Sequence, residues 1–373
     1  WSFSMLKDAA LLTLKLAKKA LQYGMILKDA TPYNIQWQEG RLIFIDSLSF
    51  EKYTEQPWRP YRQFCEHFLA PLLLMHYSKQ SLQQLLLAWP DGIPLSAVAG
   101  LLPWRSRFSI HTYLHVHLHA RLSAKKGNAT RQPTHLSKVK LLNLLTSLEA
   151  LVQGLRSPSE KTNWSDYYEE ASQREGYLES KKEIMANWAD SLEDVATACD
   201  MGANQGQFAH LLAKRNIRTV AVDSDAASID KLYQLLKDSK ETNIHPLIID
   251  LANPSPATGV NNRERTAFLE RLDADLLLAL ALIHHLAIGR NIPFSDIASL
   301  FSATRKYLII EFVPATDEKT QLLLRSKSID FVQYTEENFL AAFAKYFSME
   351  KRASIPGSGR TLFLMKRKPS EAA

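Results

Sequence analysis

A short glycine-containing loop, Asp200-x-Gly202-x-Asn204-x-Gly206, combines residue types that can hold a nucleotide. Glycines let the backbone turn sharply from a strand into a helix and let a ligand approach closely. Asn204 stands where a third glycine is expected, and asparagine tolerates left-handed backbone angles. The next apolar segment ends in Asp223, whose carboxylate could accept hydrogen bonds from ribose hydroxyls. The pattern indicates nucleotide binding, and its alternative is a tight turn without a ligand.

The spacing of this loop argues against two common nucleotide sites. Dinucleotide-binding loops place their glycines as G-x-G-x-x-G, whereas this loop reads G-x-N-x-G after an aspartate. The G-K-[ST] triplet of phosphate-binding loops does not occur in the chain. The cofactor is therefore expected to belong to another nucleotide class.

Two adjacent histidines, His284 and His285, interrupt the apolar run LLLALALIHHLAIG from Leu276 to Gly289. A run of this kind can be a buried strand or a buried helix, and periodicity alone does not separate the two. Neutral imidazole can accept a proton from a hydroxyl or an amine. Glu311, in LIIEFVP, is a further catalytic candidate. The alternatives are that the histidines cap or pack a loop and that Glu311 binds nearby backbone.

The elements that must position these residues alternate along the second half of the chain. Strand-like segments at 194–200, 219–223, 245–250, 274–282 and 306–313 are separated by helix-like segments that include 207–214 and 227–239. Such alternation predicts an α/β fold with a parallel sheet covered on both faces. Ligands of these sheets bind beyond the carboxyl ends of the strands. The two histidines are then expected at that edge, beside the cofactor.

Three motifs in this order resemble those of class I S-adenosylmethionine-dependent methyltransferases. CDMGANQGQF resembles their first motif, AVDSD the acidic end of their second strand, and LIIDLANP their third-strand motif. The resemblance covers about residues 185–373. Within it, NPSPATGVNNRER, ALALIHHLAIGRNIPF and IIEFVP are similar to the bacterial group of nodulation-protein NoeA-like methyltransferases.

This resemblance implies a Rossmann-like, mostly parallel seven-stranded sheet and S-adenosyl-L-methionine as cofactor. It places Asp250 where the adenine amino group is recognised, with Leu251 beside it. It also implies cofactor contacts for a set of residues around the glycine loop: Asp200, Gly202, Asn204, Gly206 and Asp223. Residues 186–373 are the expected methyltransferase domain. Residues 158–185, which contain Tyr167, Tyr168, Tyr177, Lys181 and Lys182, are expected to form a connecting helix that covers the cofactor or packs on the sheet.

Residues 1–157 are predicted to form a separate, mainly helical domain that resembles the C-lobe of kinases. Asp29-x-x-x-x-Asn34 followed by Asp46 resembles a kinase catalytic loop and its metal-binding aspartate. A glycine-rich loop and a phosphate-pairing lysine are not visible upstream, and Phe-Gly does not follow Asp46. We therefore expect a kinase-like scaffold without phosphoryl transfer. An active kinase would need its missing parts from elsewhere.

The charge distribution and the cysteine content limit which partners and which cellular compartment the sequence suggests. Residues 1–160 hold 19 Lys and Arg against 10 Asp and Glu, so the basic excess lies there. This basic excess could favour an anionic partner such as nucleic acid, a phosphorylated glycan or a membrane surface. The alternative is a solvated basic face without a partner. No motif for nucleic acid accompanies it, and no apolar run is long enough to span a bilayer. Two distant cysteines favour a reduced, cytoplasmic protein.

Histidines 111, 115, 117 and 119 form one further candidate site. The last three alternate as on one face of a strand, and could bind a metal or be an ordinary polar face. No metal is expected. The function expected for the whole chain is methyl transfer to an unidentified O or N acceptor. An acceptor that carries an anionic group would complement the basic residues of the first domain. The alternative is a non-catalytic cofactor-binding protein whose first domain recruits an anionic partner.

Overall fold

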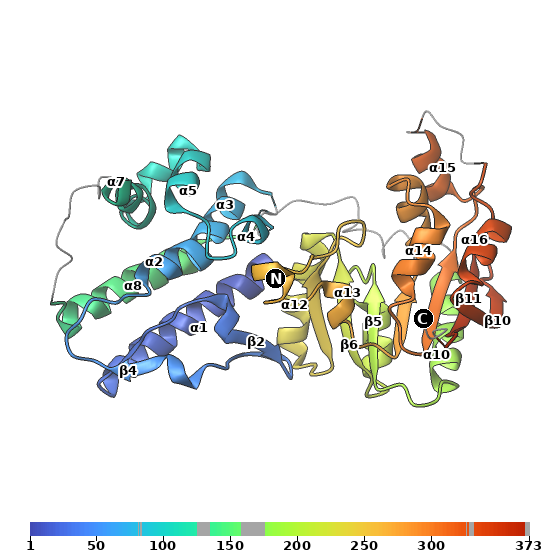
Figure 1. The fold of residues 1–373 in the computed structure, drawn as a ribbon, viewed down its shortest axis with the longest axis horizontal. Coiled ribbons are helices and arrows are strands. Elements are labelled where there is room, and N and C mark those ends of the chain that lie inside the picture. The colour runs from blue at the N-terminus through green and yellow to red at the C-terminus, as the bar shows by residue number, and fades with distance from the viewer. Residues whose placement is uncertain are drawn as a thin grey trace. The chain divides into compact units, whose positions relative to one another are not determined.

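The computed structural model describes residues 1–80, 82, 84–124, 135–157, 176–325, 327 and 332–369. The chain divides into two compact units. Unit 1 comprises residues 1–160 with 237–242, and unit 2 comprises 161–236 with 243–373. Figure 1 traces both units from the blue N-terminus to the red C-terminus.

Unit 1 is mainly helical, with two small antiparallel strand pairs, β1–β4 and β2–β3. In chain order its elements are α1 (Phe3–Gln22), β1 (Met25–Leu27), η1 (Pro32–Asn34), β2 (Ile35–Gln38), β3 (Arg41–Phe44), η2 (Ser47–Ser49), β4 (Phe50–Lys52), α2 (Tyr61–Phe64), η3 (Cys65–Leu69), α3 (Ala70–Ser78), α4 (Leu85–Ala88), α5 (Leu95–Leu101), η4 (Trp104–Phe108), α6 (Ile110–Thr112), η5 (Tyr113–Leu118), α7 (His119–Ala124) and α8 (Lys138–Gly154).

The core of unit 1 forms where α1 lies along α8, as Figure 1 shows. Leu14 and Leu21 of α1 and Leu145 and Leu148 of α8 share one buried cluster. Their spacing of seven residues in α1 and three in α8 places apolar side chains on one face of each helix. Residues 61–78 and 85–88 form several short helices, with a π-helical turn at Cys65–Leu69.

The strand face expected at the histidine segment is wrong, because residues 110–124 are helical. The histidine spacing is compatible with a helix as well as a strand, since His111, His115 and His119 are each four residues apart. The ring nitrogens of His115 lie 2.8 Å from the Tyr61 hydroxyl and 2.9 Å from the Ser147 hydroxyl. His117 Nε2 lies 2.8 Å from the Ser106 hydroxyl. These contacts satisfy buried imidazoles within a helical core.

Unit 2 is an α/β arrangement, with a mostly parallel sheet between helices. Its elements are α10 (Tyr177–Asp190), β5 (Thr197–Met201), α11 (Gln207–Ala213), β6 (Arg218–Asp223), α12 (Ala226–Ser239), β7 (Ile244–Ile248), η6 (Val260–Asn262), α13 (Phe268–Arg271), β8 (Leu276–Ala279), η7 (His285–Gly289), α14 (Phe294–Phe301), β9 (Tyr307–Phe312), α15 (Glu318–Arg325), α16 (Glu336–Phe343), β10 (Phe347–Ser354) and β11 (Thr361–Arg367).

In the described part of the chain, seven strands form one sheet in the order β10-β11-β9-β8-β5-β6-β7. Strands β5 to β9 are parallel, and β11 runs antiparallel to both β9 and β10. The four residues of β8 are completely buried. Leu277 and Ala279 face one core cluster with α14 and α16, whereas Leu276 and Leu278 face another with α10 and α11. Burial on both faces explains the unbroken apolar run.

The helix expected before the sheet is present in part. Tyr167 and Tyr168 lie outside the described residues. From Tyr177 onward, α10 packs on the sheet, with Tyr177, Met185 and Trp188 in the same cluster as β8. None of the described helices is long and apolar enough to cross a membrane.

Candidate active site

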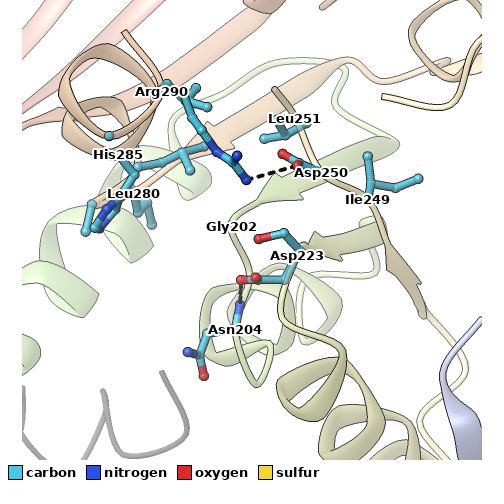
Figure 2. Close-up of a pocket in the computed structure, with 14 residues that line it drawn as sticks. Gly202, Asn204, Asp223, Ile249, Asp250, Leu251, Leu280, His285 and Arg290 are labelled. Carbon is cyan, nitrogen blue, oxygen red and sulfur yellow. Dashed lines mark hydrogen bonds and ion pairs between the residues drawn. The ribbon is translucent and has the colours of Figure 1, made fainter. Parts of the chain in front are cut away.

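A cavity of about 270 Å³ opens at the carboxyl ends of β5, β6, β7 and β8. Figure 2 shows side chains from these strand ends and from η7 converging around it. It is lined by Gly202, Asn204, Asp223, Ser224, Ile249, Asp250, Leu251, Leu280, Ala281, Leu282, His285, Leu286, Gly289 and Arg290. The cavity therefore brings together residues from both the glycine loop and the histidine segment.

The glycine loop follows β5 in a left-handed backbone conformation that its residue types permit. Gly202, Asn204 and Gly206 have φ of 83°, 51° and 77°. The amides of Gly202 and Ala203 both donate to the carbonyl of Val222, at 2.8 and 2.9 Å, which pins the loop to β6. A Cβ at Gly202 would reach Leu282 at 3.4 Å. The loop thus keeps its backbone close to the cavity.

Gly206 has a different role from its two neighbours. It does not line the cavity but is the N-cap residue that precedes α11. A Cβ at this position would come within 2.7 Å of Leu232 in α12. Its backbone angle and its packing both require glycine.

Asp223 ends β6 with its carboxylate held from two sides. Oδ2 accepts the amide hydrogen of Asn204 at 2.8 Å, drawn in Figure 2, and Oδ1 accepts that of Asp225 at 2.8 Å. Burial raises the pKa of Asp223, while these backbone bonds oppose the rise. Each carboxylate oxygen can accept more than one hydrogen bond. The group is therefore oriented yet still able to bind hydroxyls.

Asp250, just after β7, faces Asp223 across the cavity (Figure 2). Its Oδ1 accepts the amide hydrogen of Ala252 at 2.9 Å. Its Oδ2 accepts a hydrogen bond from Arg290 at 3.1 Å, and more than half of the Arg290 side chain is exposed. Leu251 is buried beside it. Exposed ion pairs are weak, so Arg290 can yield this oxygen to another donor.

Asp200 lies beneath the loop and outside the cavity lining. It is buried, and its Oδ2 has no hydrogen-bond partner among the described residues. Burial and then the neighbouring Asp223 carboxylate raise the pKa of Asp200 to about 7, against the opposing charge of Lys181. A carboxyl group whose charge is this finely balanced is common at functional sites.

The two histidines begin a helical turn and occupy different environments. His285 lines the cavity, whereas His284 is buried outside its lining. Their rings are 4.0 Å apart between centroids. Burial, and then the charges of Arg360 and Lys319, lower the pKa of His285 to about 4. Burial also lowers the pKa of His284, whose Nδ1 has no hydrogen-bond partner within the described chain.

Glu311 is fully buried and lies outside the cavity lining, at the centre of a polar cluster. Its Oε2 binds Lys181 at 2.5 Å and the amide of Ala281 at 2.9 Å. Its Oε1 accepts the Tyr177 hydroxyl at 2.9 Å and Arg360 at 3.3 Å. Burial would raise the pKa of Glu311, but Lys181 and Arg360 outweigh it and hold the pKa below its usual value.

Six of the predicted site residues thus line one cavity, and four do not. The first group is Gly202, Asn204, Asp223, Asp250, Leu251 and His285, and the second is Asp200, Gly206, His284 and Glu311. Sequence reasoning missed Arg290 and the turn Leu280–Leu282. Only the resemblance of ALALIHHLAIGRNIPF to a family segment singled out this stretch.

The kinase-like residues of unit 1 have mixed surroundings. Asp46 accepts the amide of Leu48 at 3.0 Å and also binds the Ser49 hydroxyl. Asp29 Oδ1 and Asn34 Nδ2 are buried without hydrogen-bond partners among the described residues. In the described ranges no cluster of three His, Cys, Asp or Glu side chains could hold a metal ion. The kinase-like interpretation stays a prediction.

No family model matches the chain. It is 32% identical over 376 residues to nodulation protein NoeA of Rhizobium meliloti strain 1021, covering 98% of this chain and 79% of that protein.

Solved structures are similar at a lower level. Magnesium protoporphyrin IX methyltransferase from Synechocystis, with bound SAH, is 13% identical over 56% of this chain and 90% of its own, with a TM-score of 0.36. N-methyltransferase NodS of Bradyrhizobium japonicum, in complex with S-adenosyl-l-homocysteine, is 12% identical over 56% of this chain and 100% of its own, with a TM-score of 0.40. The identity to NoeA along nearly the whole chain shows that this protein belongs to the NoeA nodulation-protein family.

Proposed function

We propose that this protein transfers a methyl group from S-adenosyl-L-methionine to an oxygen or nitrogen atom of an acceptor. One observation carries the proposal, namely the Asp223 carboxylate, held by the Asn204 amide at 2.8 Å beside a glycine loop. A carboxylate at the end of the second parallel strand is placed to bind ribose hydroxyls.

The residues around the cavity fit this cofactor. Gly202 leaves its backbone open to the cavity, and Asp223 has lone pairs left for two hydroxyls. Asp250 would accept the adenine amino group as Arg290 yields, and Leu251 and Ile249 supply apolar contacts to a ring. Asp200, with an unused oxygen below the loop, suits a nearby positive charge.

When bound, S-adenosyl-L-methionine supplies a methyl group activated by a positively charged sulfur. The residues of the protein would hold the cofactor, orient the acceptor and remove the acceptor's proton. His285 is neutral at physiological pH because its pKa is about 4. It would take the proton of the attacking hydroxyl or amine. Leu280, Leu282 and Leu286 surround the same space and would exclude water from it.

Glu311 acts in this proposal as a positioning residue. It is completely buried and binds the amide of Ala281, which lines the cavity. It therefore fixes the turn that leads from β8 to the histidines without touching the substrate. His284 fills the space behind His285 in the same way.

Two measurements test the proposal separately. Titration calorimetry with S-adenosyl-L-methionine should give binding that Asp223→Ala weakens, with the exposed Asp296→Ala as matched control. Absence of binding by the wild type would overturn the cofactor assignment. Transfer of labelled methyl groups to a fractionated bacterial extract should then reveal the acceptor. Binding without any transfer would favour a non-catalytic cofactor-binding protein instead.

A further inference from the structure

Several exposed apolar side chains belong to the segment from α5 to α7 of unit 1, which is drawn in teal in Figure 1. Trp104, Phe108 and Ile110 are 72%, 75% and 73% exposed, although each is a large apolar side chain. Leu101 and Leu114, at either end of the same stretch, are also exposed. Large apolar side chains that gather on a surface mark interaction sites more often than single ones do.

These side chains are neighbours on a firmly packed segment. The rings of Trp104 and Phe108 are 5.2 Å apart between centroids. Ile110 and Leu114 are four residues apart in consecutive helical turns, and therefore on one helical face. On the inner side of the segment, buried Ser106 binds buried His117 at 2.8 Å. The exposure therefore does not come from a loosely attached loop.

Arginines accompany the apolar side chains. Arg105 and Arg107 are exposed between Trp104 and Phe108, and Arg121 is exposed on α7. After burial, the charges of Arg107 and Arg121 are the causes that lower the pKa of His117, which places both near that residue. We call Leu101, Trp104, Arg105, Arg107, Phe108, Ile110, Leu114 and Arg121 the arginine–apolar surface.

The charge of this part of the chain is one-sided. Residues 92–148 contain eight Lys and Arg residues and no Asp or Glu. Nearly the whole basic excess of the first 160 residues lies in this interval. The partner of the arginine–apolar surface must therefore be negatively charged and must also accept aliphatic side chains.

We propose that the arginine–apolar surface binds the headgroup region of an anionic lipid bilayer. Interfacial segments combine Trp, Phe and Leu side chains, which enter the boundary of the acyl chains, with arginines that contact lipid phosphates. Nucleic acid would occupy Trp104, Phe108 and the arginines, because bases stack on aromatic rings. It would leave Leu101, Ile110 and Leu114 exposed to water, so the bilayer accounts for more of the surface.

Vesicle sedimentation with the full chain tests this inference. The wild type should sediment with vesicles of phosphatidylcholine and phosphatidylglycerol, should stay in solution with phosphatidylcholine alone, and should be released by high salt. Trp104→Ser with Phe108→Ser should weaken binding at least about tenfold. Arg107→Gln and Arg121→Gln should weaken it about fivefold each.

Matched controls separate this surface from general properties of the protein. Leu48→Ser alters a side chain that is 81% exposed elsewhere in unit 1 and should leave binding unchanged. Lys15→Gln with Lys19→Gln removes two exposed charges of α1 and should have little effect. Circular dichroism and thermal unfolding confirm that each variant is folded.

Quenching by brominated lipids gives a second readout. Bound wild type should lose part of its tryptophan fluorescence, and Trp104→Phe should bind but lose most of that quenching. The proposal is overturned if the wild type does not bind anionic vesicles, or if the surface variants bind as well as the controls. Binding to single-stranded RNA in place of vesicles, lost in the same variants, would reassign the surface to nucleic acid.

Discussion

The side chain of Glu311 accepts a hydrogen bond from the backbone amide of Ala281 at 2.9 Å. Ala281 lines the cavity with φ of 51°, a left-handed conformation that alanine rarely adopts. A buried carboxylate at the end of β9 thus fixes the turn after β8, where the chain passes to His284 and His285. Lys181 and Arg360 compensate its charge.

Glu311→Gln should lower the free energy of unfolding by about 3–5 kcal/mol, because it removes the anion that pairs with buried Lys181, whereas Arg360 keeps its pair with Asp317. Since the pKa of Glu311 is held low, its stabilising effect is present above the carboxyl's usual pKa and is lost as pH falls. Urea unfolding measures the effect. Adding Lys181→Met should recover part of the loss, whereas simple additivity of the two losses would contradict the coupling.

Ala281 tests the conformation of the turn directly. Ala281→Gly should change the unfolding free energy by less than about 1 kcal/mol, because relief of the positive φ offsets the added flexibility. Ala281→Val should destabilise by about 2 kcal/mol or more, because a β-branched side chain resists this conformation. Thermal unfolding of both variants measures the difference. Equal effects of glycine and valine would show that the turn is not strained.

Asp223→Asn should weaken binding of S-adenosyl-L-methionine by roughly 10- to 100-fold, the range for losing hydrogen bonds to a charged group. The amide retains the shape but offers one acceptor oxygen in place of two. Calorimetry at fixed salt measures the change. Asp296→Asn, on an exposed carboxylate of α14, is the control and should bind like the wild type.

His285→Ala should reduce kcat by about 100-fold while leaving cofactor affinity nearly unchanged, as expected for removal of a general base. The rate of the wild type should fall as pH drops toward about 4, where His285 becomes protonated. The neighbouring His284→Ala should mainly lower thermal stability, because His284 is buried beside the cavity. Unchanged turnover in the double variant would remove the base assignment.

Asp200 should make the protein less stable as pH rises. Its pKa rises from 3.8 to about 7 on folding, so between these values the folded state holds a proton that the unfolded state has lost. Stability from this group is full below its ordinary pKa and is lost as pH approaches 7. Asp200→Asn keeps the shape and should flatten that fall in urea-unfolding series across pH. An unchanged slope would mean that Asp200 is already ionised when folded.

Much of unit 2 could be read from local patterns. The strands β5 to β9 were expected near their observed bounds, since each is a short apolar run between helices. The expectation for 274–282 extended too far, because β8 ends at Ala279 and the chain then turns at Ala281. The strands β10 and β11 were expected only through the seven strands of the family fold, although β11 contains the buried apolar run 362–365. In β10, most side chains are exposed.

The sequence by itself determined the order of strands and helices, the glycine loop and the carboxylates at the strand ends. These follow from local apolar periodicity and from backbone angles that few residue types adopt. Only the tertiary structure decided that His285 lines the cavity while His284 does not, that Arg290 pairs with Asp250, and that Glu311 lies inside the protein. Those facts depend on contacts between segments distant in the chain: Glu311 meets Lys181 130 residues away. No local pattern encodes such contacts.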